Sequence, residues 1–175
     1  MTLENTAMKT FICLILALAS PLAPAQKPER PLVTKDTFLK ELSKDYEPPP
    51  EGARGIDVTP PPSVAVTLFF KHDSTELADE SSLKQLQEAA AAFKDAKLQP
   101  YAFQVEGHCD SDGEDDYNLK LSQRRAEAIV KLLAERFGVA AKMLHPAGKG
   151  ETEPIADNNT EEGKQQNRRV VFVRK

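Results

Sequence analysis

The sequence predicts an α+β fold, a two-layer sandwich in which two main helices pack on one mixed four-stranded sheet. Two stretches repeat apolar residues at helical spacing, and short stretches with strand-like alternation surround them. Their order is β-α-β-α-β-β. The expected strands lie within residues 64–69, 101–107, 143–148 and 168–173, and the expected helices within residues 79–94 and 122–137. We expect the folded domain to span residues 63–175.

Each element has its own local signal. Val64, Val66 and Leu68 fall on one face of an extended chain, as a half-buried strand requires. Residues 79–94 place leucine, alanine and phenylalanine on one helical stripe. The second helix is expected to begin at Ser122 as its N-cap and to end before Gly138. Residues 150–167 are polar and rich in turn-forming side chains, and they predict a long loop before the last strand.

The N-terminus has the layout of a secretory signal peptide covering residues 1–25. Lys9 precedes an apolar run over residues 11–19, and Ala23-Pro24-Ala25 offers a cleavage site before Gln26. The apolar run is shorter than the roughly 20 residues that a membrane-spanning helix needs. We therefore expect a secreted mature chain without an integral membrane span.

Residues 26–62 are predicted to form a spacer. They contain eight of the thirteen prolines, which favours an extended, semi-rigid chain. Within them, a short helix over residues 34–44 is predicted from the Thr34 cap and from the spacing of Phe38 and Leu42. We expect this helix to lie free of the domain, although docking on the domain or on a partner protein is an alternative.

The charge pattern excludes a nucleic-acid surface. The formal net charge is −4 with a pI near 5.5. Lys and Arg are interspersed with acids instead of forming a basic patch. No nucleic-acid partner is therefore expected.

The candidate site lies around the start of the second long helix. At 100° per residue, Arg125 falls in the apolar stripe with Leu121 and Ile129. If Ser122 is the N-cap, Arg125 sits beside first-turn amides that have no helical partner, and a carboxylate would satisfy both. Asp110, at the end of the preceding strand, would then accept a cationic group. The pattern predicts a pocket for a zwitterion, unless Asp110 and Arg125 merely pair with each other or with a neighbour such as Glu106.

Five separated blocks of sequence resemble the OmpA-like C-terminal domain in order and spacing. They are Gly107-His108-x-Asp110, Tyr117-Asn118, Leu121-Ser122-x-x-Arg125-Ala126, Gly148-x-Gly150-Glu151-x-x-Pro154 and Asn159-x-x-x-Gly163-x-x-x-Asn167-Arg168-Arg169-Val170. The resemblance covers about residues 64–175. It implies non-covalent binding of peptidoglycan in the periplasm, through the meso-diaminopimelate of the stem peptide, by a protein associated with the cell wall or outer membrane.

The resemblance also implies roles for particular residues. Asp110 would hold the diaminopimelate ammonium and Arg125 its carboxylate, while Ser122 assists and Asn118 fixes the turn. Asp73 matches a polar position at the pocket rim.

Two positions depart from the family pattern. Lys71 replaces an acid at the rim, and Cys109 replaces the usual threonine beside the pocket. With residues 1–25 removed, Cys109 is the only cysteine, so no intramolecular disulfide is possible.

Other chemistries fit less well. A calcium loop counted from Asp110 lacks the glycine and the glutamate that an EF-hand needs. His108 and Cys109 are neighbours on a strand and point to opposite faces, so we expect no metal site there, and we expect His108 to bond within the turn. No catalytic motif is recognised, and we expect neither an enzyme nor a cofactor. Two rivals stay open: an envelope scaffold that binds a protein partner through residues 26–62, and a peptidoglycan-trimming enzyme.

Overall fold

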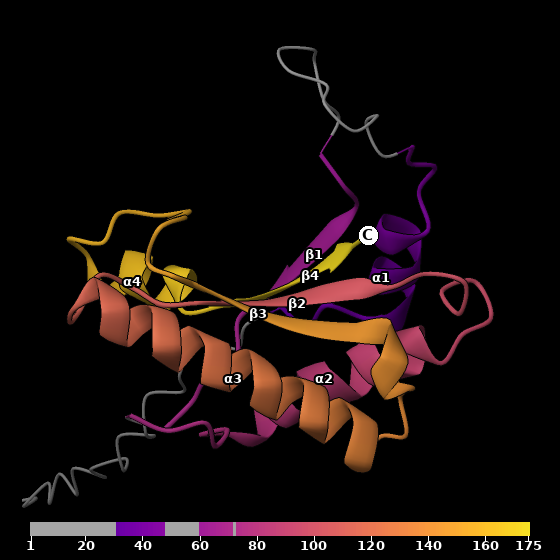
Figure 1. Cartoon of the computed structure of the whole chain (residues 1–175), viewed down its shortest axis with the longest axis horizontal. Helices are drawn as coiled ribbons and strands as arrows, with labels where there is room; N and C mark the ends of the chain where they lie inside the picture. Colours follow the sequence, from indigo (N-terminus) through magenta and orange to yellow (C-terminus); the bar gives the residue numbers. More distant parts are fainter. Residues whose placement is uncertain (1–30, 48–59, 72) are drawn as a thin grey trace, which may run out of the picture. The chain divides into compact units, whose positions relative to one another are not determined.

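The centre of the molecule is one mixed four-stranded sheet (Figure 1). Its strands stand in the order β1-β4-β2-β3. Strand β4 is antiparallel to both β1 and β2, whereas β2 and β3 are parallel. Their bounds are β1 (Ser63–Val66), β2 (Phe103–His108), β3 (Leu144–Gly150) and β4 (Val170–Arg174). The predicted α+β class with its mixed four-stranded sheet is confirmed.

This computed structural model describes residues 31–47, 60–71 and 73–175. The predicted signal peptide, residues 1–25, lies outside the described residues, as do residues 48–59 of the Pro-rich segment. From Leu32 onward the chain forms one compact unit. No helix within the described ranges is long and apolar enough to span a membrane.

The helices α2 and α3 cover one face of the sheet (Figure 1). The helical elements are α1 (Lys35–Leu42), α2 (Glu80–Phe93), α3 (Asp115–Glu135), the 3₁₀ turn η1 (Ala141–Met143) and α4 (Glu161–Asn167). Helix α2 starts where the sequence predicts, because the Asp79 side chain accepts a hydrogen bond from Ser82 N at 2.8 Å. Helix α4 was not predicted. It lies inside the stretch expected to be a loop and is capped by Thr160.

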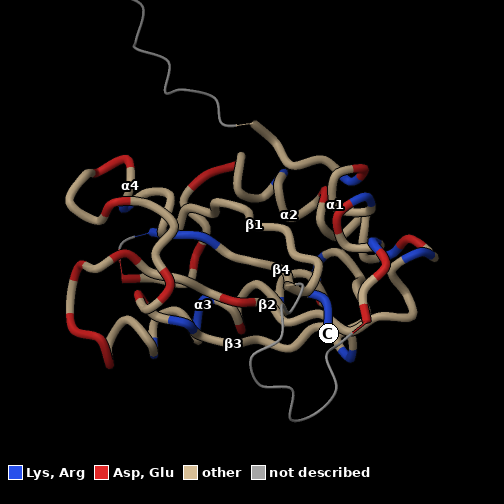
Figure 2. Tube along the Cα trace, turned by 90° about the horizontal axis from the view of Figure 1, so that it is seen from above, with Lys and Arg blue, Asp and Glu red and all other residues tan. Residues whose placement is uncertain are grey.

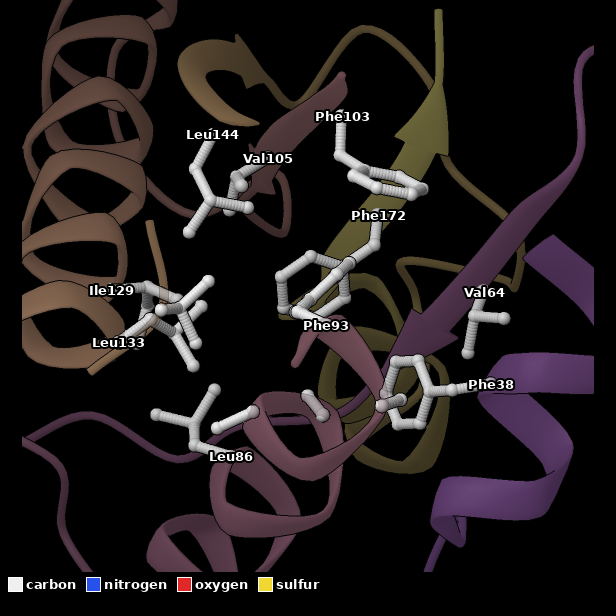
Figure 3. Packing of buried hydrophobic residues seen from close by; sticks show 14 of the residues in the cluster. Phe38, Val64, Leu86, Phe93, Phe103, Val105, Ile129, Leu133, Leu144 and Phe172 are labelled. Atoms are coloured by element: carbon white, nitrogen blue, oxygen red, sulfur yellow. The ribbon is translucent and has the colours of Figure 1, made fainter. Parts of the chain in front are cut away.

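The core forms between the helices and the inward-facing strand residues (Figure 3). Val64 and Val66 alternate with exposed neighbours on β1, as the sequence predicts. The Phe93 ring of α2 lies 4.9 Å from the ring of Phe103 and 5.2 Å from the ring of Phe172, measured between centroids. Such aromatic side chains carry much of the burial energy of a small domain.

Helix α1 belongs to this core, which corrects the expectation that it lies free. Phe38 and Leu42 are fully buried, and the Phe38 ring lies 5.8 Å from that of Phe172. The Gln85 side chain accepts from Val33 N at 2.9 Å and donates to Val33 O at 2.8 Å. Each buried apolar side chain contributes about 1.5–3 kcal/mol, enough to hold a short amphipathic helix. The folded part of the chain thus begins before residue 63.

Two glycines allow α3 to lie directly on the sheet. A Cβ on Gly107 would stand 2.4 Å from the backbone oxygen of Ser122, and one on Gly148 would stand 2.6 Å from the nitrogen of Gln123. Both distances are far below van der Waals contact. The close approach places the middle of α3 next to the ends of β2 and β3.

Candidate functional site

Helix α3 begins eight residues earlier than an N-cap at Ser122 predicts, which changes the expected geometry. Its first residue is Asp115 and its N-cap is Glu114. Asp115 and Asp116 place negative charge in the first turn, where the helix dipole favours it. Arg125 therefore stands almost three turns into the helix, about ten residues after the start. The prediction that free first-turn amides assist the ligand is wrong.

Arg125 does lie on the buried face of α3, as its place in the apolar stripe predicts. It is 9% exposed, and its Nε donates to the backbone oxygen of Ser74 at 3.2 Å. Its guanidinium carbon stands 4.7 Å from the centre of the Phe70 ring. Among the described residues no carboxylate forms an ion pair with it. Burial lowers the pKa of Arg125, and the nearby Cys109 and Asp110 only oppose this effect in part, so the charge is held in an unfavourable place.

Asp110 is paired, but with a residue other than those considered from the sequence. It is 7% exposed, and its Oδ2 forms an ion pair with Nη1 of Arg168. Its Oδ1 accepts from the backbone N–H of Asp112 at 3.1 Å. Arg168 also reaches Glu161, with 2.9 Å between Nη2 and Oε1. An ionised carboxylate has about four lone-pair sites, so Asp110 can still accept a further donor.

A pocket of about 520 Å³ brings most of the predicted residues together. It opens between the segment that follows β1, the turn after β2, and the first half of α3. The predicted residues at its wall are Asp73, Cys109, Asp110, Asn118 and Arg125. The other lining residues are Phe69, Phe70, Lys71, Asp112, Tyr117, Leu121 and Arg168.

Asn118 organises the turn, as predicted. It is 2% exposed, and its Nδ2 lies 3.3 Å from the backbone oxygen of Asp110, 3.0 Å from that of Asp112 and 2.6 Å from Oε2 of Glu151. A buried amide that donates to several loop oxygens fixes the loop conformation, because losing any of these hydrogen bonds would leave a buried polar group unsatisfied. The acidic turn is therefore held in one shape at the pocket wall.

Ser122 does not line the pocket. It is fully buried in the middle of α3, where its Oγ accepts from Gly150 N at 2.9 Å and donates to Leu119 O at 2.9 Å. The predicted N-cap and ligand-assisting role are both corrected. This hydroxyl joins α3 to the end of β3, and it thereby supports the pocket from behind.

The rim contains Asp73, Tyr117 and Lys71. The Tyr117 hydroxyl donates to Oδ1 of Asp73, and this hydrogen bond raises the pKa of Tyr117. Asp73 adopts a positive φ of 47°, which is uncommon for a residue with a side chain. Lys71 is held by Glu76, with 2.6 Å between Nζ and Oε2.

Cys109 is buried at the pocket wall. Its Sγ lies 3.6 Å from the backbone oxygen of Asn118, to which the thiol donates a weak hydrogen bond. Burial raises the pKa of the Cys109 thiol, although Arg125 acts in the opposite direction. The residue is therefore a neutral thiol at neutral pH.

His108 lies outside the pocket, and the prediction that it bonds within the turn is wrong. It is 3% exposed, and among the described residues neither ring nitrogen has a hydrogen-bond partner; Nε2 lies 3.9 Å from Oε2 of Glu106. Burial, together with the charge of Arg169, lowers the pKa of His108 to about 4.

Acidic and basic residues are scattered along the chain trace (Figure 2). Acidic segments are frequent at the end of the molecule that carries α4 (Figure 2). The pocket itself contains both signs of charge, with Arg125 and Arg168 facing Asp110 and Asp73. A ligand with both a carboxylate and an ammonium matches such a mixed site better than an ion of one sign.

Residues 69–168 match the sequence profile of the OmpA family, which is more than half of the chain. The chain belongs to the OmpA family. One OmpA-like relative, outer membrane porin F of Pseudomonas aeruginosa, is 37% identical over 118 residues. The aligned part covers 66% of this chain and 34% of the porin, so the chain spans about a third of that relative's length.

Solved structures resemble the OmpA-family fold seen here. The peptidoglycan-associated lipoprotein from Burkholderia pseudomallei superposes with a TM-score of 0.54 and 29% identity, covering 62% of this chain and 88% of that one. The cell wall anchor of the T6SS from Pseudomonas aeruginosa gives a TM-score of 0.50 and 30% identity, covering 63% of this chain and 79% of that one.

For three residues of matching motifs, sequence reasoning did not predict the contacts that they make in the pocket of this OmpA-family domain. Phe70 lies beneath Arg125, Tyr117 holds Asp73, and Arg168 pairs with Asp110. Tyr117 and Arg168 belong to the matching motif blocks, but the motifs do not state what these side chains contact. The spacing of four residues between Lys164 and Arg168 suits one helical face and could have indicated α4.

Proposed function

We propose that this protein binds peptidoglycan non-covalently in the periplasm, through the diaminopimelate of the stem peptide. The observation that carries the proposal is the buried Arg125, which has no carboxylate partner within the described chain and faces a pocket that also contains Asp110. Two structural relatives carry names that point to the cell wall, a peptidoglycan-associated lipoprotein and a cell wall anchor. The predicted signal peptide agrees with this location.

Arg125 is the proposed carboxylate receptor. The Phe70 ring and the Ser74 carbonyl hold the guanidinium in place, and the Cys109 thiol lies beside it. A guanidinium has five N–H donors, so donors remain for an incoming carboxylate. An incoming carboxylate would convert an unpaired buried cation into a charge-assisted pair. This pairing is the main source of affinity in the proposal.

Asp110 is the proposed ammonium receptor, and Arg168 sets its orientation. Because Asp110 already pairs with Arg168, the ligand ammonium would share the carboxylate and would not meet a free charge. Asp73 and Asp112 line the same pocket and supply further negative charge. We infer that the ammonium adds orientation and selectivity and contributes less affinity than the carboxylate.

The alternative that α1 grips an envelope partner with its apolar stripe has little support. Phe38 and Leu42, the residues that such a partner would contact, are fully buried in the domain. Residues 48–59 of the same segment lie outside the described residues. Peptidoglycan trimming is tested as an outcome of the experiment that follows.

The proposal is tested by sedimenting the purified chain with two kinds of peptidoglycan sacculi. One kind carries diaminopimelate in its stem peptide, and the other carries lysine, which lacks the second carboxylate. We expect retention on the first kind only. Equal retention on both would contradict diaminopimelate recognition, and released muropeptides would identify an enzyme instead.

Asp110→Asn and Asp115→Asn provide a matched pair for the same assay. Asp110 lines the pocket, whereas Asp115 is an exposed acid in the first turn of α3. A charge-assisted contact contributes about 1.5–3 kcal/mol, so Asp110→Asn should weaken binding about tenfold or more. Asp115→Asn should bind as the wild type does. Equal behaviour of the two variants would exclude Asp110 as the ammonium receptor.

A further inference from the structure

The unpaired His108 is the starting point for a second site. Neither ring nitrogen of this buried side chain has a hydrogen-bond partner in the described part of the chain, although buried polar groups are nearly always hydrogen-bonded. A buried nitrogen left unsatisfied costs free energy, so an unpaired imidazole calls for a ligand. The ring belongs to the last residue of β2, beyond the pocket wall.

Two carboxylates stand around this ring. Glu106 lies two residues before His108 on β2, so both side chains are on the same face of the strand. Val105 and Gly107 are on the other face, which packs against the helices. Glu153 comes from the turn after β3. One ligand atom from each of Glu106, His108 and Glu153 lies within 4.8 Å of the other two. One ion can reach all three with small side-chain adjustments.

The Lys149 ammonium lies between the two carboxylates, where a bound cation would lie. Its Nζ lies 3.3 Å from Oε1 of Glu106 and 2.9 Å from Oε1 of Glu153. The ammonium neutralises the carboxylates but cannot satisfy His108, because an ammonium has no acceptor for an imidazole N–H. The carboxylate nearest the ring, Oε2 of Glu106, stands 3.9 Å from Nε2, beyond hydrogen-bond distance. The Lys149 side chain is 30% exposed, so it can turn into solvent and release both carboxylates.

We propose that Glu106, His108 and Glu153 bind a divalent first-row transition metal ion of the zinc type, with Lys149 as an internal competitor. One imidazole nitrogen and two carboxylate oxygens form a donor set that zinc accepts. Calcium and magnesium prefer oxygen ligands alone, so the buried imidazole selects against them. The site is separate from the peptidoglycan pocket, since none of its three ligands lines that pocket.

The test is calorimetric titration of zinc chloride into the tag-free chain, in a buffer that does not chelate metals. We expect one zinc ion per chain. His108→Gln should weaken binding at least about tenfold. His145→Gln is the matched control, because His145 is an exposed histidine on the adjacent strand β3. Thermal unfolding of each variant verifies that it is folded.

Lys149→Met gives a test that does not depend on removing a ligand. Because this change removes the competing ammonium, zinc should bind several-fold more tightly, whereas a role of Lys149 as a ligand would make binding weaker. Zinc affinity that is equal in the wild type and His108→Gln would overturn the proposal. The same holds if neither the wild type nor Lys149→Met binds zinc.

Discussion

The two charged clusters on either side of the β2 end differ in the group that is left without a partner. In the pocket, no described carboxylate forms an ion pair with the cation Arg125, while Asp110 already pairs with Arg168. On the opposite face of the sheet, no described residue hydrogen-bonds to the His108 ring, while the acids Glu106 and Glu153 share Lys149. The first cluster is therefore suited to an anion, and the second to a cation.

This difference shows that the unpaired group, and not the number of charges, indicates the ligand. Both clusters mix acids and bases, and a count of charges would not separate them. A buried charge or ring nitrogen without a partner is costly, and binding removes that cost. A substitution at the contact between β2 and α3 should affect both clusters, whereas substitutions within the pocket should affect the pocket alone.

Gly107→Ala should have the largest effect, because both clusters depend on the contact between β2 and α3. The added methyl would meet the Ser122 backbone oxygen at 2.4 Å, and neither backbone can move away easily. We expect a loss of about 3 kcal/mol in the free energy of unfolding, measured by urea denaturation. Gly138→Ala is the control: its methyl meets nothing within 4 Å, so only its φ of +69° costs about 1–2 kcal/mol. A smaller loss for Gly107→Ala than for Gly138→Ala would contradict this packing.

Alkylation of Cys109 reports on the pocket without any substitution. Burial raises the pKa of the Cys109 thiol above its ordinary value of 9.0. The reactive thiolate is therefore scarce at pH 8 and becomes more abundant as the pH increases. Iodoacetamide should react at least about tenfold more slowly with the folded chain than with the chain in urea. The rate should increase with pH and fall further when peptidoglycan fragments are bound. Rapid alkylation at pH 8 would show that the thiol is open to solvent.

Phe70→Leu should weaken peptidoglycan binding moderately and leave zinc binding unchanged. The substitution keeps an apolar side chain but removes the ring beneath the Arg125 guanidinium. A cation–π contact of this kind is worth about 1–2 kcal/mol, so we expect a loss of roughly tenfold in retention by sacculi. A parallel loss of zinc affinity would show that the two clusters are not independent.

Lys71→Asp should have the smallest effect, and it should strengthen binding. The change restores an acid at the pocket rim and removes a cation that opposes the ligand ammonium. Because the side chain is exposed, the gain should stay below about fivefold. Sacculus binding at low and high salt is the measurement, and the gain should shrink as salt screens the charge. Weaker binding would place the ammonium elsewhere.

The sequence predicts those features that depend on neighbouring residues. Alternation predicted the inward face of β1, the apolar stripe over residues 79–94 predicted α2, and helical periodicity placed Arg125 on the buried face. The start of α3 was misplaced because acids suit both an exposed turn and a first helical turn. Local signals could not choose between those two structures.

The remaining features depend on residues that are far apart in the sequence. Arg168 pairs with Asp110 across 58 positions, and Gln85 clamps Val33 across 52. Neither pair has a local pattern that would reveal it. For the same reason, the sequence does not reveal that His108 is buried without a hydrogen bond to its ring, because its surroundings include the turn after β3.

The central claim is that Arg125 awaits a carboxylate, and titration of free meso-diaminopimelate tests it most directly. Arg125→Gln is compared with Arg136→Gln, an exposed arginine near the Phe137 ring at the far end of the same helix. We predict at least about tenfold weaker binding for Arg125→Gln and unchanged binding for Arg136→Gln. Wild-type affinity in Arg125→Gln, or equal affinity of the wild type for lysine, would contradict the account.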